Sequence, residues 1–153
     1  MYPYKVSFII PCFNESGNIN RIYEKIGGSF KDCPFQIVFV DDGSKDSTFQ
    51  EIKDLENEDN IIGISFSRNF GKEAAMLAGL KESKGEYTTF IDADLQQDPA
   101  IVRNMMQILD QKTEVDCVCA VQAKRKEPFM ISQMKRAFYK INNFFLPPSL
   151  WNE

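Results

Sequence analysis

Hydrophobic and polar positions follow two different periods along this chain, and their alternation predicts its elements. Short apolar runs rich in β-branched and aromatic residues, each followed by polar or turn-forming residues, are typical of strands. These runs are VSFIIP (6–11), QIVFV (36–40), IIGISF (61–66), YTTFI (87–91) and DCVCAV (116–121). Segments of helical period lie between them, at about 18–28, 47–57, 72–83 and 99–111. The order predicts an α/β fold, in which helices cover both faces of a mostly parallel sheet.

Local signals mark the ends of these elements and the character of the C-terminal region. Ser47 with Gln50 predicts a capping box, and Asp98 before Pro99 predicts a cap ahead of a proline at the first helical position. The segment 130–145 has apolar residues at helical spacing together with three basic residues. It predicts a basic amphipathic helix, which either covers the sheet or contacts a membrane surface or a missing domain. We therefore expect a core at 1–128 and a separate C-terminal region at 129–153.

Composition narrows the class of protein. The 153 residues are 43% hydrophobic and 26% charged, enough for one domain with a full core. The net charge of −4 gives no support to nucleic-acid binding through a broadly basic surface. No signal peptide and no run of about 18 apolar residues is present, so we expect a cytoplasmic chain, peripheral or tethered at the cytoplasmic membrane face in the full-length protein. Four cysteines without CxxC spacing, in a chain without histidine, predict buried free thiols rather than zinc ligands.

Acidic residues follow three of the predicted strands. The first is followed by PCFNE, the second by DDGS and the fourth by DADLQ. In open parallel sheets, ligands bind outside the carboxyl ends of the strands, so these segments should share one crevice. Asp92 and Asp94 repel each other unless a cation is present, and oxygen ligands without histidine or cysteine suit Mg²⁺ or Mn²⁺. A diphosphate would complete the metal shell; the alternative is that the pair merely caps a turn.

Two further segments contain candidate ligand-binding residues, one for a ribose or base and one for a phosphate. Asp41 and Asp42 are suited to binding a ribose hydroxyl or a base edge, or alternatively to forming an Asx turn with a helix cap. Arg68 and Lys72 flank Gly71 at a predicted junction between a loop and a helix. Cations and backbone amides at such a junction can bind phosphate, although a solvated helix start has the same pattern.

Four motifs in order carry a family resemblance: VSFIIPCFNESGNI, IVFVDDGSKDST, SRNFGKEAAMLAGL and GEYTTFIDADLQQDP. Across about residues 5–125 they resemble the donor-binding half of family 2 inverting glycosyltransferases. The most similar subgroup is that of the polyprenol-phosphate sugar synthases, such as dolichol-phosphate mannose synthase and bactoprenol-phosphate glucosyltransferases. The resemblance implies a GT-A fold and a nucleotide-diphosphate sugar bound through a divalent metal.

Carried over by motif, the resemblance assigns roles to individual residues. It places Asp92 and Asp94 as the catalytic pair and, with Gln96, as the ligands of Mg²⁺ or Mn²⁺. The resemblance also implies a set of donor-binding residues, to which we add three candidate phosphate cations, Arg68, Lys72 and Arg125. The full set is Pro11, Phe13, Glu15, Val40, Asp42, Arg68, Lys72, Asp92, Ala93, Asp94 and Arg125. Phe13 stands where many relatives have tyrosine, which keeps the ring and loses the hydroxyl.

Two departures from the family pattern stand out. Gln122 occupies the position where the family usually has an arginine, and a neutral amide cannot replace a cation at a phosphate. Either Arg125 takes over, or donor binding is weakened. The chain also stops at Glu153, whereas relatives continue into an acceptor-side segment and many add transmembrane helices. We therefore expect a truncated form of a longer protein, which is inactive alone if the missing segment is essential.

The resulting functional hypothesis is hexose transfer with inversion, from UDP- or GDP-hexose to polyprenyl phosphate. Such an acceptor is already largely ionised at neutral pH, which reduces the need for a general base. One alternative is a family 2 transferase acting on a sugar hydroxyl in cell-surface polysaccharide synthesis, and another is a non-catalytic nucleotide-sugar-binding fragment. A dinucleotide-dependent oxidoreductase is disfavoured, because PCFNES follows the first strand where GxGxxG is required.

Overall fold

The computed structural model describes residues 2–112 and 114–121, and the elements in this part all lie within Met1–Cys119. In chain order they are β1 (Tyr4–Cys12), α1 (Ile19–Ser29), β2 (Phe35–Asp41), α2 (Thr48–Leu55), β3 (Ile61–Ser65), α3 (Lys72–Lys81), β4 (Gly85–Phe90) and α4 (Ala100–Gln111). The α/β class, the four predicted helices and the first four predicted strands are confirmed, with ends that differ by at most two residues.

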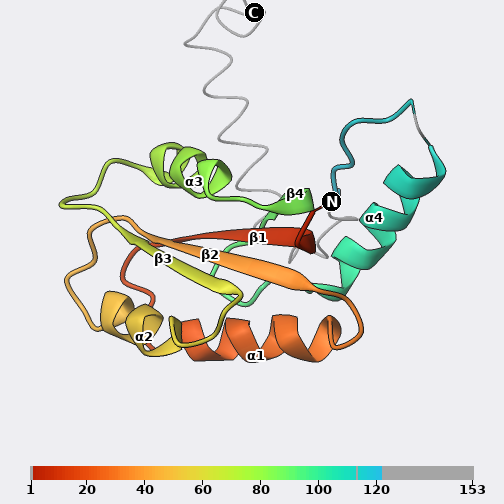
Figure 1. Cartoon of the computed structure of the whole chain (residues 1–153). Coiled ribbons are helices and arrows are strands. Elements are labelled where there is room, and N and C mark those ends of the chain that lie inside the picture. Colours follow the sequence, from red (N-terminus) through yellow and green to blue (C-terminus); the bar gives the residue numbers. More distant parts are fainter. Residues whose placement is uncertain (1, 113, 122–153) are drawn as a thin grey trace, which may run out of the picture. The chain divides into compact units, whose positions relative to one another are not determined.

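The strands form a parallel sheet in the order β3-β2-β1-β4 (Figure 1). The chain steps from β1 to β2 to β3 in one direction and then returns past β1 to β4. Because parallel crossovers are right-handed, the reversal places α3 on the opposite face from α1 and α2. The strand order reverses between β1 and β4, which is where a ligand crevice is expected at the carboxyl ends of the strands.

The face covered by α1 holds most of the core. Alternate residues of β1, such as Phe8 and Ile10, point to this face and are fully buried. The ring of Phe30, at the end of α1, packs edge-on against Phe8 with ring centroids 5.0 Å apart. The period of 3.6 residues brings Ile19, Ile22 and Ile26 of α1 onto the same side of the helix, and all three are buried.

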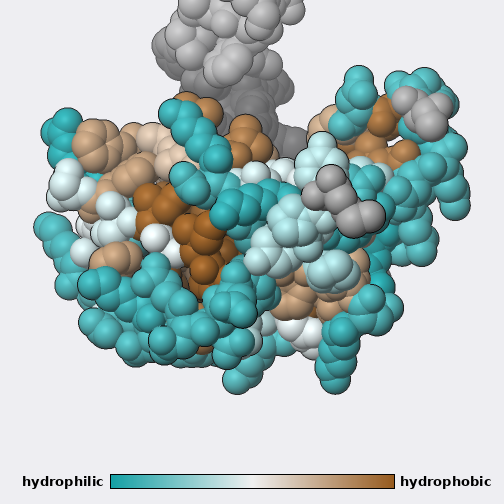
Figure 2. All heavy atoms as spheres, viewed as in Figure 1, coloured by the Kyte–Doolittle hydropathy of each residue, from teal (hydrophilic) through white to brown (hydrophobic). Residues whose placement is uncertain are grey.

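The face covered by α3 is packed more thinly. Its buried apolar cluster consists of Val38, Val40 and Ala75. The helix comes close to the sheet at Gly79, where an added Cβ would lie 2.4 Å from Cγ2 of Ile9. Apolar side chains gather between α3 and β3 (Figure 2), around an open cavity of about 400 Å³ lined by residues that include Ile62, Ile64 and Leu77.

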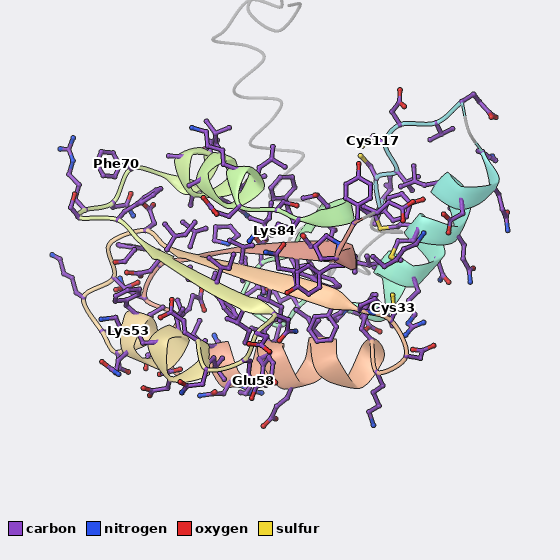
Figure 3. The ribbon with its side chains drawn as sticks, viewed as in Figure 1. Cys33, Lys53, Glu58, Phe70, Lys84 and Cys117 are labelled. Carbon is purple, nitrogen blue, oxygen red and sulfur yellow. The ribbon has the colours of Figure 1, made fainter. Side chains whose placement is uncertain are left out.

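The fifth predicted strand, at 116–121, is wrong. The structure has no regular element there, and Val121 is 89% exposed. Within the described residues β4 pairs with β1 alone, so this segment has no ladder to satisfy its backbone groups, and apolar alternation cannot replace a partner. The prediction of buried thiols fails here for the same reason. Cys117 (labelled in Figure 3) and Cys119 are exposed, whereas Cys12 is buried and Cys33 is partly buried.

The predicted helix caps have mixed outcomes. At α2 the Ser47 hydroxyl caps no backbone N–H and instead donates to Oε1 of Glu51, while Oδ1 of Asp46 accepts the Thr48 N–H at 3.0 Å. The capping box is therefore wrong. The Asp46 carboxylate, a stronger acceptor than the Ser47 hydroxyl, accepts a backbone N–H at the start of α2 instead. At α4 the cap is confirmed, since Oδ1 of Asp98 accepts the amide N–H of residue 100. The predicted helix at 130–145 and the boundary at 128 lie outside the described residues.

Candidate functional site

A cavity of about 350 Å³ opens at the carboxyl ends of β1 and β4, next to the start of α3. This position matches the strand-order reversal described above. We call it the acidic cavity, because carboxylates dominate its charged side chains. Its lining residues are Pro11, Cys12, Phe13, Glu15, Asp42, Asn69, Gly71, Lys72, Asp92, Ala93 and Asp94.

The segment after β1 forms one wall of the acidic cavity. The chain turns at Asn14, which has a φ of 55°, and the Glu15 amide donates to Oγ1 of Thr48 at 2.8 Å. The Glu15 carboxylate accepts a bond from Nδ2 of Asn18 at 2.8 Å. Phe13 projects at this wall with 45% of its surface exposed, so its ring is free to contact a ligand.

The two aspartates at the end of β2, Asp41 in its last position and Asp42 just after it, are buried and bonded to backbone amides. The Asp42 carboxylate accepts the Phe70 N–H at 2.7 Å and the Gly71 N–H at 3.0 Å. The Asp41 carboxylate accepts the Ser44 N–H and the hydroxyl of Ser65. Buried carboxylates need such donors, since an unpaired buried charge is costly. Asp42 therefore holds the loop ahead of α3, and it also contributes to the cavity wall.

The paired aspartates follow β4 directly. The last ladder contact is the Ile91 N–H to the Ile9 carbonyl, at 3.1 Å. Oδ1 of Asp92 then accepts the Lys72 ammonium at 2.5 Å, and Oδ1 of Asp94 accepts the amide of Gln96 at 3.0 Å. Both aspartates line the acidic cavity, whereas the exposed Gln96 does not.

A lysine from α1 fixes the turn that follows the aspartate pair. Leu95 has a left-handed φ of 63°, which is unusual for a residue other than glycine. The Lys25 ammonium donates to the carbonyls of Leu95 at 3.1 Å and Gln97 at 2.8 Å. These two bonds tie the turn to α1 and hold the adjacent carboxylates in place.

The acidic cavity has an excess of negative charge. Glu15, Asp42, Asp92 and Asp94 provide four carboxylates, and Lys72 provides one ammonium, a net of three negative charges among the described lining residues. A polyphosphate would be repelled from such a surface. A cation that neutralises the carboxylates would reverse this repulsion.

The donor set suits a hard divalent cation. Within residues 2–112 and 114–121, no three His, Cys, Asp or Glu side chains are grouped closely enough to enclose a metal ion by themselves. Two carboxylates with open space beside them match the habit of Mg²⁺, which takes one or two carboxylates together with substrate phosphates and water. Asp92 and Asp94 therefore fit an ion that is shared with a ligand.

A second cavity of about 520 Å³ adjoins the acidic cavity. Phe13 and Asn69 line both cavities. Asp41, Lys45 and Arg68 supply the charged groups of the second one, and Phe49 and Phe66 supply further aromatic rings. Figure 3 labels Phe70 on the loop between β3 and α3, where the Arg68 guanidinium lies 4.7 Å from its ring centroid. The pair of cavities has room for an elongated ligand with one aromatic and one anionic end.

The structure brings most of the predicted site residues together. The acidic cavity contains Pro11, Phe13, Glu15, Asp42, Lys72, Asp92, Ala93 and Asp94, and the second cavity contains Arg68. Val40 is fully buried against the α3 face and lines neither cavity, and Gln96 also lies outside both. Arg125 and Gln122 lie outside the described residues.

Sequence reasoning missed three residues that line the acidic cavity and one lysine that supports the turn beside it. Asn69 and Gly71 lie between Arg68 and Lys72 in RNFGK, so the same junction signal identifies them. Cys12 follows the strand's apolar alternation and gives no signal of its own. Burial, with further contributions from nearby carboxylates, raises the pKa of its thiol far above the usual range, so it stays a neutral wall residue. The supporting lysine, Lys25, donates to a carbonyl 70 positions away in the sequence, so no local pattern reveals it.

Comparisons with known proteins relate the chain to one family. The model of the family described as Glycosyl transferase family 2 matches residues 7–152. The protein CsbB of Bacillus subtilis is 38% identical over 141 residues, which cover 90% of this chain and 42% of that protein. The bactoprenol glucosyl transferase of Shigella phage SfV is 33% identical over 153 residues, covering 95% of this chain and 48% of that protein. The chain thus spans about half the length of the curated relatives it matches.

A solved structure shares the fold. The mannosyltransferase PcManGT from Pyrobaculum calidifontis, solved with GDP-Man and Mn²⁺, superposes with a TM-score of 0.60 at 25% identity. The match covers 71% of this chain and 33% of that one. Across the described part of the chain, no helix has both the length and the apolar character needed to cross a membrane.

Proposed function

The chain belongs to glycosyl transferase family 2 and has an α/β fold of the GT-A type, and we propose that it forms the donor-binding part of a hexosyltransferase. The donor is a nucleotide-diphosphate sugar, UDP- or GDP-hexose. The observation that carries this proposal is the acidic cavity, which lies at the strand-order reversal and joins a second, aromatic cavity. A diphosphate and its nucleoside need these two environments side by side.

The proposed metal ligands are Asp92 and Asp94, which hold Mg²⁺ or Mn²⁺. The bound ion supplies the positive charge that offsets the diphosphate leaving group. Gln96 joins the ligand set if its exposed side chain turns toward the cavity. The net negative charge of the lining residues supports the proposal, because a diphosphate cannot approach it without a compensating cation.

The chain's own residues bind and orient the donor. The exposed ring of Phe13, shared by the two cavities, stacks on the nucleobase, with Pro11 and Glu15 beside it. Ala93 is small and 2% exposed, so the diphosphate can pass close to the backbone between the two aspartates. Asp42 acts as a positioning residue through its bonds to the amides before α3.

Two cationic side chains of the described residues, on the loop before α3 and at the start of α3, bind the phosphates of the donor. Lys72 and Arg68 flank the loop that Asp42 fixes, and Arg68 lines the second cavity. Arg125, outside the described residues, is proposed as a further phosphate cation in place of the family arginine replaced by Gln122. Val40 contributes through the core packing that supports the end of β2, since its side chain is fully buried.

The proposed acceptor is polyprenyl phosphate, at the cytoplasmic face of the membrane in the full-length protein. The name of the SfV relative, a bactoprenol glucosyl transferase, supports this acceptor class. The acceptor phosphate oxygen attacks the anomeric carbon opposite the departing nucleoside diphosphate, so the configuration inverts. The acceptor phosphate is mostly ionised at neutral pH, which removes the need for a strong base among these residues.

Calorimetric titration of the purified chain with UDP, GDP and their hexose conjugates tests the donor site, each with Mn²⁺ and with EDTA. Binding of one nucleotide that depends on Mn²⁺ is expected. Absence of binding in a sample shown to be folded by circular dichroism would refute a donor site in this chain. Transfer to polyprenyl phosphate in detergent micelles is then measured, with a sugar-hydroxyl acceptor as the comparison. Binding without transfer to either would indicate a nucleotide-sugar-binding fragment.

A further inference from the structure

The Lys72 ammonium is already bonded to Asp92, one of the two carboxylates proposed to bind the metal. The ammonium lies 2.5 Å from Oδ1 of Asp92, and the other carboxylate oxygen lies 3.4 Å from Nε2 of Gln97. Among the described residues lining the acidic cavity, Lys72 is the one cationic side chain. A metal ion bound to Asp92 must therefore compete with an ammonium for the same carboxylate.

The backbone under both partners is fixed from different parts of the sheet. Lys72 is the first residue of α3, and the two amides just before it are bonded to the buried carboxylate of Asp42 after β2. Asp92 follows the last ladder contact of β4 with β1. The pair thus spans the reversal in strand order, and neither backbone has to move for the pair to form or break.

The side chains, unlike the backbone, are free to separate. Lys72 retains 55% of its side-chain surface exposed, and Asp92 retains 37%. An ion pair with this exposure is weak, because water and salt compete with it. The lysine stem has four flexible carbons, so the ammonium can leave the carboxylate and remain inside the cavity.

We propose that Lys72 is an exchangeable counterion of Asp92, displaced by the divalent cation and then available to the donor diphosphate. In the exchange the ammonium keeps its proton, the carboxylate passes from lysine to metal, and no covalent bond changes. The inference rests on the proposed function, and it adds a coupling between two ligands. Metal binding frees a phosphate cation, so metal and nucleoside diphosphate each strengthen the binding of the other.

Titration of Mn²⁺ alone tests the exchange, with free Mn²⁺ measured by electron paramagnetic resonance at fixed ionic strength. Lys72→Met is expected to bind Mn²⁺ about two- to fivefold more tightly than the unmodified chain, the range for removal of an exposed ion pair. Lys45→Met is the matched control, because it removes one positive charge from the neighbouring cavity and leaves the Asp92 pair intact. The Mn²⁺ affinity of Lys45→Met should stay closer to that of the unmodified chain than the Mn²⁺ affinity of Lys72→Met does.

A second titration tests what the freed ammonium does. UDP and GDP are added at saturating Mn²⁺, and Lys72→Met is expected to bind the preferred nucleotide about tenfold more weakly, as one charge-assisted contact to phosphate is lost. The same substitution must therefore strengthen metal binding and weaken nucleotide binding. A merely structural lysine would weaken both or change neither.

The two titrations separate failure of this inference from failure of the proposed function. If Lys72→Met binds Mn²⁺ no more tightly than the unmodified chain, including the case in which neither binds, the exchange is refuted. A gain equal to that of Lys45→Met would also refute it, because general charge removal would explain it. If Mn²⁺ binding behaves as expected and no nucleotide binds any variant, the exchange stands and the donor site is refuted.

Discussion

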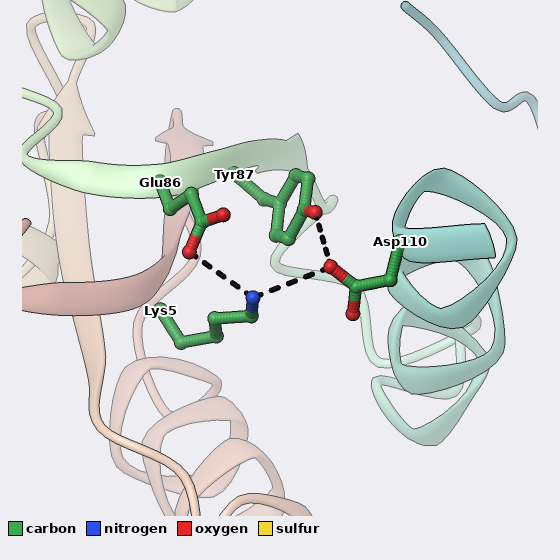
Figure 4. Close-up of polar contacts among 4 residues, drawn as sticks. All are labelled: Lys5, Glu86, Tyr87 and Asp110. Atoms are coloured by element: carbon green, nitrogen blue, oxygen red, sulfur yellow. Dashed lines mark hydrogen bonds and ion pairs between the residues drawn. The ribbon is translucent and has the colours of Figure 1, made fainter. Parts of the chain in front are cut away.

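The two ends of the parallel sheet carry similar charged residues in different proportions. At the amino ends, the Lys5 ammonium donates to Oε2 of Glu86 at 3.0 Å and to Oδ1 of Asp110 at 3.4 Å (Figure 4). The Tyr87 hydroxyl donates to the same Asp110 oxygen at 2.6 Å. In the acidic cavity at the carboxyl ends, Lys72 is the single cationic side chain among the described lining residues, against four carboxylates. In the amino-end cluster both carboxylates bond to the one ammonium and the named charges sum to −1, whereas those of the acidic cavity sum to −3.

This difference separates a structural cluster from a binding site built of the same residue types. In the amino-end cluster, the hydrogen bond to Glu86 raises the pKa of Lys5, and the hydrogen bond from Tyr87 lowers the pKa of Asp110. Each group holds its neighbour in the protonation state that favours the cluster. At the carboxyl end the carboxylates instead face a cavity, and their surplus charge is available to a metal ion. Charge balance therefore distinguishes the two ends better than residue identity does.

Removing one carboxylate from the carboxyl end should have the largest effect. Asp94→Asn keeps the shape of the side chain and loses a proposed metal ligand. Mn²⁺-dependent nucleotide binding is expected to fall by about a thousandfold or more, beyond the 10- to 100-fold typical of losing an outer-shell partner. Calorimetry with Mn²⁺ measures the loss, and thermal unfolding checks that the fold is retained.

Asp54→Asn is the matched control for that experiment, because Asp54 lies on α2 and bonds to Gln50 there. It removes the same charge without touching the acidic cavity. Preserved Mn²⁺-dependent binding in Asp94→Asn would contradict the metal assignment. An equal loss in both variants would show that overall charge, and not the position of the carboxylate, controls binding.

The next largest effect is expected at the carboxyl ends of the strands, where the loop after β2 lies against the backbone of the loop after β3. Gly43 has a φ of 74°, and an added Cβ would lie 2.5 Å from the carbonyl carbon of Arg68. Gly43→Ala should lower the free energy of unfolding by about 2–3 kcal/mol, since it combines backbone strain with a clash that no side-chain rotation relieves. Urea unfolding measures the loss, and nucleotide binding should weaken as the Arg68 loop shifts.

Gly17→Ala is the internal control for the clash. Gly17 has a similar φ of 83°, and its added Cβ would meet nothing within 4 Å. This variant should therefore cost about 1 kcal/mol, the conformational part alone. If the two variants cost the same, the close approach at Gly43 contributes nothing to stability.

The sequence predicts the layers of this fold and the edge of the sheet that holds the site, because periodicity and strand ends are local properties. Asp92 and Asp94 follow directly from the rule that ligands bind at the carboxyl ends of parallel strands. The fifth strand could not be judged in this way, since a strand depends on a partner that the segment itself does not encode. The Asp42 bonds to residues 70 and 71, and the Lys25 bonds to the turn after the aspartates, join distant parts of the chain. Such bonds depend on the three-dimensional path, so no local pattern contains them.

The smallest effect is expected at the amino ends, and it should depend on pH. The folded pKa of Asp110 is lowered, so its contribution to stability is present above the unfolded value of about 3.9 and is lost as the pH falls through the folded value. Asp110→Asn removes that contribution at every pH. Its melting temperature should be about 1–3 °C below that of the unmodified chain at pH 7, and the gap should shrink by pH 3. Thermal unfolding by circular dichroism at both values measures it.

The same variant tests whether the two ends act independently. Asp110→Asn should leave Mn²⁺-dependent nucleotide binding unchanged, because the cluster shares no residue with the acidic cavity and distant sites usually act additively. A gap in melting temperature that is equal at pH 7 and pH 3 would show that Asp110 acts through packing rather than charge. A loss of nucleotide binding would show that the two ends are coupled through β1 and β4, the strands that join them. In that case charge balance at one end could not be treated apart from the other, and the comparison between a closed cluster and an open site would fail.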